Sequence, residues 1–336
     1  MARETSDPSR CARALDCSPM QRPALAPIAL LLFCALAAHA AGAPQKGGFS
    51  LTKLTVDASR IVNGGPGKDG IHSVDAPKFV GLPQATWLGF DTEVLGLTVG
   101  AESRAYPVRM LEYHQIVNDT FGDAPVVVSY DPLAGTPLAF SRKVDGRTLT
   151  FGVSGLLYND NFLMFDRETG SLWSQFLGRA ISGPLSGKKL QRLPLRQETA
   201  GAWVKRVGDT KVLVHPDPER VPYVTSPYSA YWTEDKILFP VDARDERYHA
   251  KELVLGVVVG GKARAYLGSI LTHEGGKVDD RVGGKRVQVR YSTDTGTFDW
   301  EVDEGVEVTE AYWLAWKAFH PDTEIWHDRA EAAKPK

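Results

Sequence analysis

The sequence VLGLTVGAESRAY, residues 94–106, recurs without a gap at residues 254–266 as VLGVVVGGKARAY, with eight of thirteen positions identical. Self-similarity of this kind is typical of a duplicated structural unit. The first six residues are rich in β-branched and apolar side chains, which favours a strand. The sequence therefore predicts two copies of one mainly β unit.

Two further matches extend the repeat. Residues 119–136 align with residues 280–297, and Trp203 before residues 209–212 resembles Trp316 before residues 322–325. Between these matches the offset falls from 161 to 113 positions, so the first copy carries about 48 residues that the second lacks. Folding the same scaffold twice does not account for this extra segment, which makes it the place to look for functional residues.

Local patterns favour strands over helices. Strands are predicted at residues 94–99, 126–130, 138–144 and 148–153, with a hairpin turn at Asp145-Gly146, and a further hairpin joins residues 162–166 to 171–176. Short helices are predicted near residues 110–116, 200–207 and 311–319. We expect an α+β fold, mainly antiparallel β, with two copies of an internal repeat and a polar insertion in the first copy.

The predicted layout follows from these matches. Its parts are a signal peptide at residues 1–43, a linker at 44–63, the first repeat copy with the insertion and the candidate site at 64–215, a connector at 216–250, the second repeat copy as scaffold at 251–327, and a tail at 328–336.

The N-terminal stretch has the pattern of a secretory signal. Arg22 precedes an apolar run from Ala24 to Ala38, and Ala38-His39-Ala40 is typical of a cleavage site. The apolar run is shorter than the ~20 residues of a membrane-spanning helix. We expect a periplasmic or secreted protein with no transmembrane segment in its mature part, and a translation start at Met20.

Composition excludes several classes of function. The three cysteines, Cys11, Cys17 and Cys34, all precede residue 44, so the mature chain offers no thiolate for an Fe–S cluster, a zinc site or a nucleophile. With 39 basic and 41 acidic residues and no basic block, nucleic-acid binding is not expected. Residues 65–70 fit G-x-G-x-x-G, but they contain a proline and precede no helical pattern, so NAD is not expected. Haem is not expected either.

Polar side chains are densest in the first copy. If Tyr130-Asp131 ends one strand and Tyr158-Asn159 leaves another, both could meet at one edge of a sheet and form a pocket. The residues expected to bind a small polar ligand are Asn118, Asp131, Thr136, Tyr158, Asn159, Asn161, Trp173 and Gln175.

Alternative interpretations stay open. Asp131 and His114 could ligate an oxygen-preferring divalent metal, or they could act as the acid and base of an enzyme. Asn118-Asp119 is also typical of a turn, and Trp173 could complete the core. A third possibility is an envelope interaction module without a pocket.

Several stretches resemble the domain-of-unknown-function family 3179 (DUF3179). The resemblance is carried by residues 68–71, 77–79, 104–107, 117–119, 152–159 and 172–175, and it spans about Gly64 to Trp326. It implies no established activity. Many relatives have Tyr-Cys-Pro-Leu-Cys-Gly-Thr where this chain has YDPLAGT at residues 130–136, so the resemblance implies a member that lacks the Cys-x-x-Cys pair. In the second copy, Ser292 occupies the position of Asp131.

Overall fold

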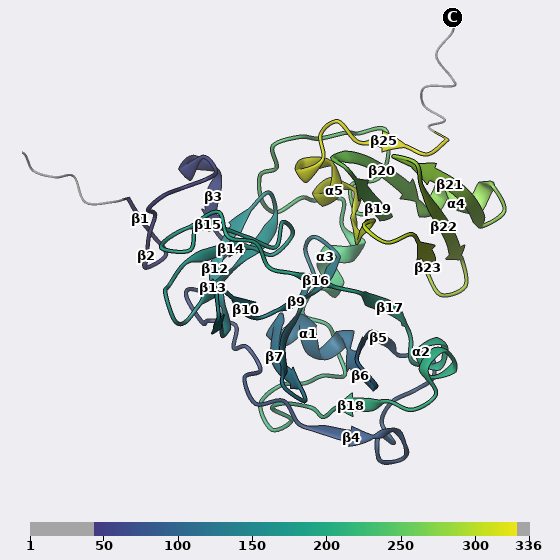
Figure 1. The fold of residues 1–336 in the computed structure, drawn as a ribbon, viewed down its shortest axis with the longest axis horizontal. Helices are drawn as coiled ribbons and strands as arrows, with labels where there is room; N and C mark the ends of the chain where they lie inside the picture. The colour runs from purple at the N-terminus through teal and green to yellow at the C-terminus, as the bar shows by residue number, and fades with distance from the viewer. Residues whose placement is uncertain (1–43, 328–336) are drawn as a thin grey trace, which may run out of the picture. The chain divides into compact units, whose positions relative to one another are not determined.

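The computed structural model of the protein describes residues 44–327, and its regular structure is mostly β-strand, arranged in mainly antiparallel sheets (Figure 1). The expectation of a mainly antiparallel β fold is confirmed. The predicted signal peptide at residues 1–43, the proposed start at Met20 and the tail at residues 328–336 lie outside the described residues.

One sheet has the strand order β17-β5-β6-β18-β4. Its centre is the hairpin that contains the first copy of the repeated sequence, with Val94 opposite Pro107 and Val99 opposite Glu102. β18 runs parallel to β6, whereas the other pairs are antiparallel. The strands are β4 (Phe79–Gly81), β5 (Glu93–Val99), β6 (Glu102–Pro107), β17 (Leu195–Thr199) and β18 (Lys211–Leu213).

A second sheet has the strand order β24-β19-β20-β25. Its central hairpin places Val254 opposite Leu267 and Val259 opposite Lys262, and β25 runs parallel to β20. The strands are β19 (Leu253–Val259), β20 (Lys262–Leu267), β24 (Glu307–Tyr312) and β25 (Glu324–Ile325).

Two more sheets are antiparallel hairpins extended by a further strand. One has the order β16-β9-β8-β7 and the other the order β21-β22-β23. Asp131 and Thr136 are the last pair before the β8–β9 turn, and Ser292 and Thr297 are the last pair before the β22–β23 turn. The strands are β7 (Ile116–Phe121), β8 (Ala124–Asp131), β9 (Thr136–Ser141), β16 (Arg192–Leu193), β21 (Lys277–Val282), β22 (Lys285–Ser292) and β23 (Thr297–Val302).

The extra segment of the first copy forms most of a fifth sheet, in the order β15-β14-β13-β12-β3. Its strands are β3 (Ile61–Asn63), β12 (Phe151–Tyr158), β13 (Asn161–Asp166), β14 (Leu172–Ser174) and β15 (Arg179–Ser182). Small hairpins are β1 (Gln45–Lys46) with β2 (Phe49–Ser50), and β10 (Lys143–Val144) with β11 (Arg147–Thr148).

Residues 44–63, which we expected to be a linker, therefore contain strands, and β3 forms the edge of the fifth sheet by pairing with β12. The physical reason is apolar burial, since Ile61 and Phe49 lie in the same hydrophobic cluster as Leu156 of β12.

Helices are short and lie between strands. They are η1 (Ala58–Arg60), η2 (Leu82–Gln84), α1 (Val108–His114), α2 (Ala200–Val207), α3 (Ser229–Thr233), α4 (Gly268–His273) and α5 (Trp313–Phe319). α2 begins after Thr199, whose side chain accepts a hydrogen bond from the Ala202 amide, and ends before Gly208. Among residues 44–327, none of the helices has the length and apolarity needed to cross a membrane.

Two tryptophans pack against glycines of the central strands. Trp203 of α2 covers Gly96, and Trp316 of α5 covers Gly256, so closely that a Cβ at either glycine would overlap the indole ring. The two side chains are buried, as their matching sequence positions predicted. Each indole N–H donates to a threonine hydroxyl seven residues later, at 3.0 Å for Trp203 and 2.9 Å for Trp316.

We expect Trp203→Ala and Trp316→Ala each to lower the free energy of unfolding by about 3–5 kcal/mol, as truncations of large buried aromatic side chains do. Urea denaturation followed by circular dichroism measures the change. Trp87→Ala serves as the control, because the Trp87 side chain is 40% exposed and should contribute much less to stability. Equal losses for Trp87→Ala and Trp316→Ala would contradict the packing described above.

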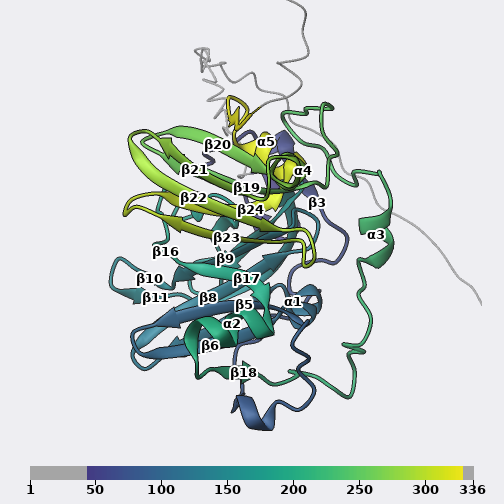
Figure 2. The same ribbon diagram turned by 90° about the vertical axis from the view of Figure 1, so that its right-hand side faces the viewer.

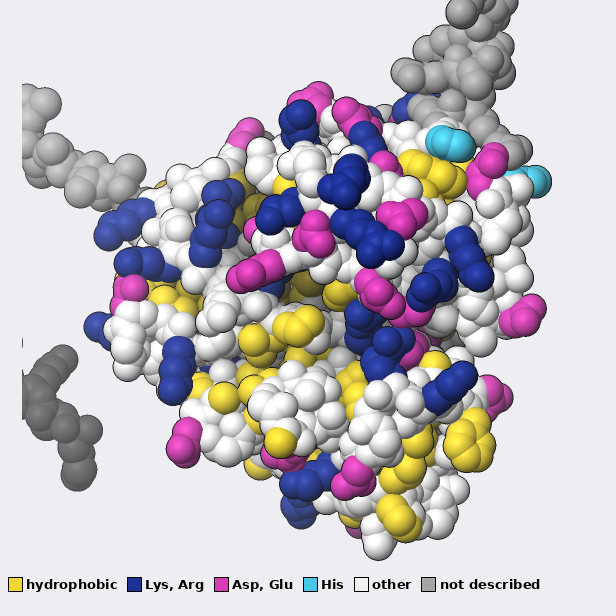
Figure 3. Space-filling model, turned by 45° about the vertical axis from the view of Figure 1, so that its right-hand side comes forward, with side chains coloured by type: hydrophobic (Ala, Val, Ile, Leu, Met, Phe, Trp, Pro, Cys, Tyr) yellow, Lys and Arg dark blue, Asp and Glu magenta, His cyan; other side chains and the backbone are white. Residues whose placement is uncertain are grey.

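The surface is mixed in character. Figure 3 shows a face on which basic and acidic side chains are interleaved, with hydrophobic side chains exposed between them. The large hydrophobic side chains most exposed among the described residues are Val224, Phe90, Leu238 and Trp87. In Figure 2, β23 lies beside β17, so the sheet formed by β21, β22 and β23 contacts the sheet that contains β5 and β6.

Candidate functional site

Asp131 is fully buried, and hydrogen bonds hold both of its carboxylate oxygens. Oδ1 accepts from the backbone amides of Leu133 (2.9 Å) and Ala134 (3.3 Å) in its own turn. Oδ2 accepts from the amide of Phe162 (2.7 Å) and from the side chain of Asn161 (2.9 Å) at the start of β13. The carboxylate therefore ties the β8–β9 turn to the sheet formed by the extra segment.

Three more of the expected site residues join Asp131 in this buried cluster. Asn161 Nδ2 donates to Gln175 Oε1 at 2.8 Å, and Gln175 Nε2 donates to the Thr136 carbonyl at 3.0 Å and to Ser129 Oγ at 3.1 Å. All four expected residues are 0% exposed. Asp131 therefore meets Asn161 at the start of β13, and the cluster is closed to solvent.

A second buried carboxylate, Asp160, lies next to this cluster. Its backbone has a φ of 55°, the left-handed region, and its Oδ1 atom has no hydrogen-bond partner. Oδ2 is 3.5 Å from the hydroxyl of Tyr231. Burial, reinforced by the nearby charge of Asp131, raises the pKa of Asp160 to about 8.

The pKa of Asp131 is also raised, to about 6, because desolvation outweighs the hydrogen bonds from Phe162, Leu133, Ala134 and Asn161. At neutral pH, therefore, Asp131 is mainly ionised and Asp160 mainly protonated. Such a pair offers one acid and one base at the same place.

The segment before the second copy covers the two carboxylates. The hydroxyl of Tyr231 in α3 donates to the Leu133 carbonyl at 3.1 Å, and the indole of Trp232 donates to the Pro132 carbonyl at 3.2 Å. The Lys251 ammonium lies 3.7 Å from the centre of the Tyr231 ring and donates to the carbonyls of Tyr231 and Glu234. The covering residues Tyr231, Trp232 and Lys251 were not among our candidates, because nothing in their local sequence links them to Asp131.

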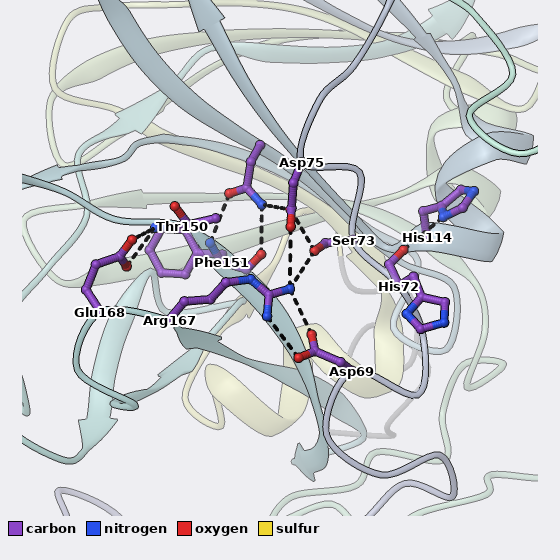
Figure 4. A network of polar contacts seen from close by, with 10 residues as sticks. Asp69, His72, Ser73, Asp75, His114, Thr150, Phe151, Arg167 and Glu168 are labelled. Atoms are coloured by element: carbon purple, nitrogen blue, oxygen red, sulfur yellow. Dashed lines mark hydrogen bonds and ion pairs between the residues drawn. The ribbon is translucent and has the colours of Figure 1, made fainter.

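Asn118 belongs to a different polar network, in which Figure 4 labels Asp69, Asp75, Phe151 and Arg167. Its side chain donates to Asp75 Oδ1 at 2.7 Å and to the Phe151 carbonyl at 2.8 Å, and it accepts from the Phe151 amide at 3.0 Å. In the same network Arg167 donates to both carboxylate oxygens of Asp69, at 2.9 Å each. These contacts join residues 69–75 to β7 and β12.

Asp119, the neighbour of Asn118, has a structural role. It accepts hydrogen bonds from Arg104 and from the hydroxyl of Tyr106. Asp280 holds Arg264 and Tyr266 in the same way, at 2.7 and 2.8 Å.

His114 lies at the end of α1, and its ring nitrogens contact protein groups other than Asp131. Nδ1 is 2.8 Å from the His72 carbonyl, and Nε2 is 2.6 Å from the hydroxyl of Tyr223. Burial lowers the pKa of His114. With Nδ1 protonated, the ring donates to His72 and accepts from Tyr223, so a neutral imidazole satisfies both contacts.

Tyr223, the hydrogen-bond partner of His114, also lines a pocket of about 510 Å³. His215 lies between two aromatic rings, with ring centres 5.4 Å from Trp87 and 5.0 Å from Tyr223. At the edge of the pocket Arg109 Nη1 is 3.0 Å from Glu112 Oε2, but the two groups are not aligned for a hydrogen bond. The remaining lining residues are Leu88, Thr92, Pro107, Met110, Pro218, Val221, Pro222 and Val224.

The other expected ligand-binding residues are engaged elsewhere. Trp173 is 0% exposed in the core and donates to Asp166 at 2.8 Å, so its ring has no free face. The Tyr158 hydroxyl is 3.3 Å from Asp242, and Asn159 accepts from the amide of Asp242 at 2.9 Å. Their side chains therefore attach the connector to the first copy.

Within the part of the chain that the structure describes, His, Asp and Glu side chains do not gather in groups of three or more that could hold a metal ion. Asp131 and His114 also have separate sets of hydrogen-bond partners.

Fold and geometry thus define a mainly antiparallel β protein with a closed carboxylate cluster and a separate aromatic pocket. The model of a family described as protein of unknown function (DUF3179) matches residues 68–303, and the chain belongs to that family. Neither a curated protein nor a solved structure matches it.

Proposed function

We propose that this chain is an exported binding protein for a small ring-bearing acid, which occupies the pocket beside His114. The observation that carries the proposal is the aromatic wall of Trp87, His215 and Tyr223 around a cavity of about 510 Å³, with the Arg109 guanidinium at its edge. A mainly apolar cavity of this size with a few polar groups is typical of small-molecule sites.

The chemistry of the lining indicates the class of ligand. Aromatic side chains favour a flat or cyclic group, and a guanidinium favours a carboxylate. The Arg109 Nη1 atom is paired with Glu112 at 3.0 Å, and the exposed remainder of the guanidinium would meet a ligand carboxylate at the edge of the pocket. His114 would act indirectly, by fixing the hydroxyl of Tyr223.

The test compares benzoate, benzyl alcohol and acetate by ligand-observed NMR and calorimetry on the full mature chain. We expect benzoate to bind and the other two to bind at least about tenfold more weakly, since each lacks one of the two recognised groups. Trp87→Ala should weaken benzoate binding, and Arg109→Gln should remove the preference for benzoate over benzyl alcohol.

Phe90→Ala is the matched control, because Phe90 is 80% exposed and does not line the pocket. Equal affinity of the Trp87→Ala and Phe90→Ala proteins for benzoate would contradict the proposed site. A wild-type protein that binds none of the three probes would favour the envelope interaction module instead.

A second candidate is an acid/base enzyme that uses the buried carboxylates. The pair of pKa values, about 6 for Asp131 and about 8 for Asp160, favours it. This proposal replaces His114 with Asp160 as the partner of Asp131, and it requires α3 to move away. Hydrogen exchange of the Leu133 and Ala134 amides tests this movement of α3. If these amides exchange only when the whole protein unfolds, α3 does not open in the folded state and the proposal is excluded.

We further propose that the chain arose by duplication. The matching registers of β5–β6 and β19–β20, the paired tryptophan–glycine contacts, and the Arg-Tyr-Asp contacts around Asp119 and Asp280 support it. Export to the periplasm or the medium is a separate proposal that rests on the N-terminal sequence. N-terminal mass spectrometry of the mature protein tests the cleavage site near residue 40.

A further inference from the structure

Acidic, amide and tyrosine side chains converge where α1, β5 and β17 approach the end of β24. Tyr312, which ends β24, donates its backbone amide to the Ala134 carbonyl at 2.7 Å and so brings this strand to the β8–β9 turn. Burial raises the pKa values of Tyr312 and Tyr130, and the charges of Glu93 and Glu112 raise both further. This group, named the acidic recess, consists of Glu93, Glu112, Gln115, Tyr130, Gln197 and Tyr312.

Glu93 indicates that water enters this part of the protein. Its side chain is exposed, yet desolvation raises its pKa against the opposing effects of a hydrogen bond from Gln197 and the charge of Arg109. A carboxylate that is accessible to water and also surrounded by protein lies in a concave part of the surface. A ligand there would contact several side chains at once.

Negative charge exceeds positive charge in the acidic recess. Arg109 Nη1 lies 3.0 Å from Glu112 Oε2, and the same guanidinium is the cation that acts on Glu93. Two carboxylates thus share one guanidinium, and the charge of Asp131 also reaches Tyr312. A bound cation would balance this excess.

Gln197 supplies an acceptor that has no donor. Its side chain is 7% exposed, and Nε2 donates to Glu93 Oε1 at 2.5 Å. Because an ionised carboxylate only accepts, the amide nitrogen has to face Glu93, which leaves Oε1 pointing elsewhere. Among the described residues Oε1 of Gln197 has no hydrogen-bond partner. A buried carbonyl oxygen in this state destabilises the fold unless something else donates to it.

Gln115 supplies a second such acceptor at a strained position. It is 5% exposed, its Oε1 atom has no partner within the described part of the chain, and its φ of 57° is unfavourable for a residue with a Cβ. Gly276, with a φ of 73°, holds the equivalent place in the other hairpin. There the Tyr291 amide donates to the Gly276 carbonyl, as the Tyr130 amide donates to Gln115, both at 2.9 Å. Glycine satisfies this backbone, so the glutamine side chain needs another reason.

We propose that the acidic recess binds a small primary amine in its ammonium form. An ammonium group offers three donors and no acceptor, which suits two amide oxygens without donors beside two carboxylates. The tyrosine rings provide faces that attract a cation. A metal ion fits less well, because His, Asp and Glu side chains of residues 44–327 form no group of three or more that could hold one.

Calorimetry on the full mature chain at pH 7 and constant ionic strength compares butylammonium, butyltrimethylammonium and 1-butanol. We expect butylammonium to bind and the other two to bind at least about tenfold more weakly. The reason is that butyltrimethylammonium carries the charge without N–H donors, whereas 1-butanol has a donor without the charge. This comparison uses the wild-type protein, so it decides the proposal even where a variant fails to fold.

Variants locate the site. Glu93→Gln should weaken butylammonium binding about tenfold, because it removes a charged acceptor. Gln115→Gly should also weaken it and leave the protein folded, since glycine holds the same backbone at Gly276. Glu304→Gln is the matched control, a loss of the same charge at an exposed residue between β23 and β24, and should leave affinity unchanged.

Three results would overturn the proposal. They are no binding of butylammonium by the wild-type protein, equal affinity for butylammonium and butyltrimethylammonium, and equal affinity of the Glu93→Gln and Glu304→Gln proteins for butylammonium.

Discussion

Replacing Asp131 by alanine is expected to lower the free energy of unfolding by about 3–5 kcal/mol at neutral pH, because each buried donor left without an acceptor costs about 1–3 kcal/mol. The carboxylate accepts from three backbone amides and the Asn161 side chain, and alanine leaves the three amides without an acceptor and Asn161 with Gln175 alone. Asparagine should not rescue the loss, since its amide nitrogen would meet another donor at one side.

Chemical denaturation of the variant and wild-type proteins measures this effect. Ser292→Ala is the matched control, because Ser292 holds the corresponding position before the β22–β23 turn but is exposed. We expect the control to change stability by less than about 1 kcal/mol, as surface substitutions usually do. A similar loss in both variants would show that the turn, and not the buried carboxylate, determines the cost.

The free energy of unfolding is expected to fall less steeply with rising pH when Asp160 is replaced by asparagine. An unfolded aspartate releases its proton near pH 3.9, whereas burial holds the folded pKa of Asp160 at about 8. Between about pH 4 and pH 8 the folded state thus keeps a proton that the unfolded state has lost. The free energy of unfolding therefore falls as pH rises, by up to about 1.4 kcal/mol per pH unit, and levels off above the folded pKa.

Asparagine carries no titrating proton and tolerates the left-handed backbone of this position. The Asp160→Asn protein should consequently gain stability relative to the wild type as pH rises from about 5 to 8. Glu310, whose pKa is raised to about 8, contributes the same sign in both proteins and cancels in the comparison.

Urea midpoints at a series of pH values measure the difference. Asp123→Asn, a change at an exposed residue, is the control and should run parallel to the wild type. Parallel profiles for Asp160→Asn and the wild type would contradict the raised pKa of Asp160.

Much of the secondary structure could be predicted locally. The helix at residues 200–207 has a threonine cap and a terminal glycine, and the strand at residues 94–99 is rich in β-branched and apolar residues. Burial of Trp203 and Trp316 could be predicted because the same faces recur in the two matching stretches. Such features depend on residues close in sequence, so local patterns reveal them.

The candidate site could be predicted only in part. Asp131, Thr136, Asn161 and Gln175 do lie together, since two hairpins of the first copy bring them to one place. His114 contacts Tyr223, 109 positions away, and Tyr231 reaches Leu133 across 98 positions. The spacing of polar and apolar residues along the sequence does not predict such contacts, because they depend on how the sheets and the connector pack against one another.

By itself, then, the sequence determined that this protein is mainly antiparallel β, that its described part contains no cysteine, and which residues could supply polar chemistry. Only the tertiary structure decided that Asp131 is closed off under Tyr231, and that a pocket opens instead beside Trp87. The physical reason is that alternation along a strand specifies which face is buried, whereas solvent access to a side chain depends on segments that are distant in sequence.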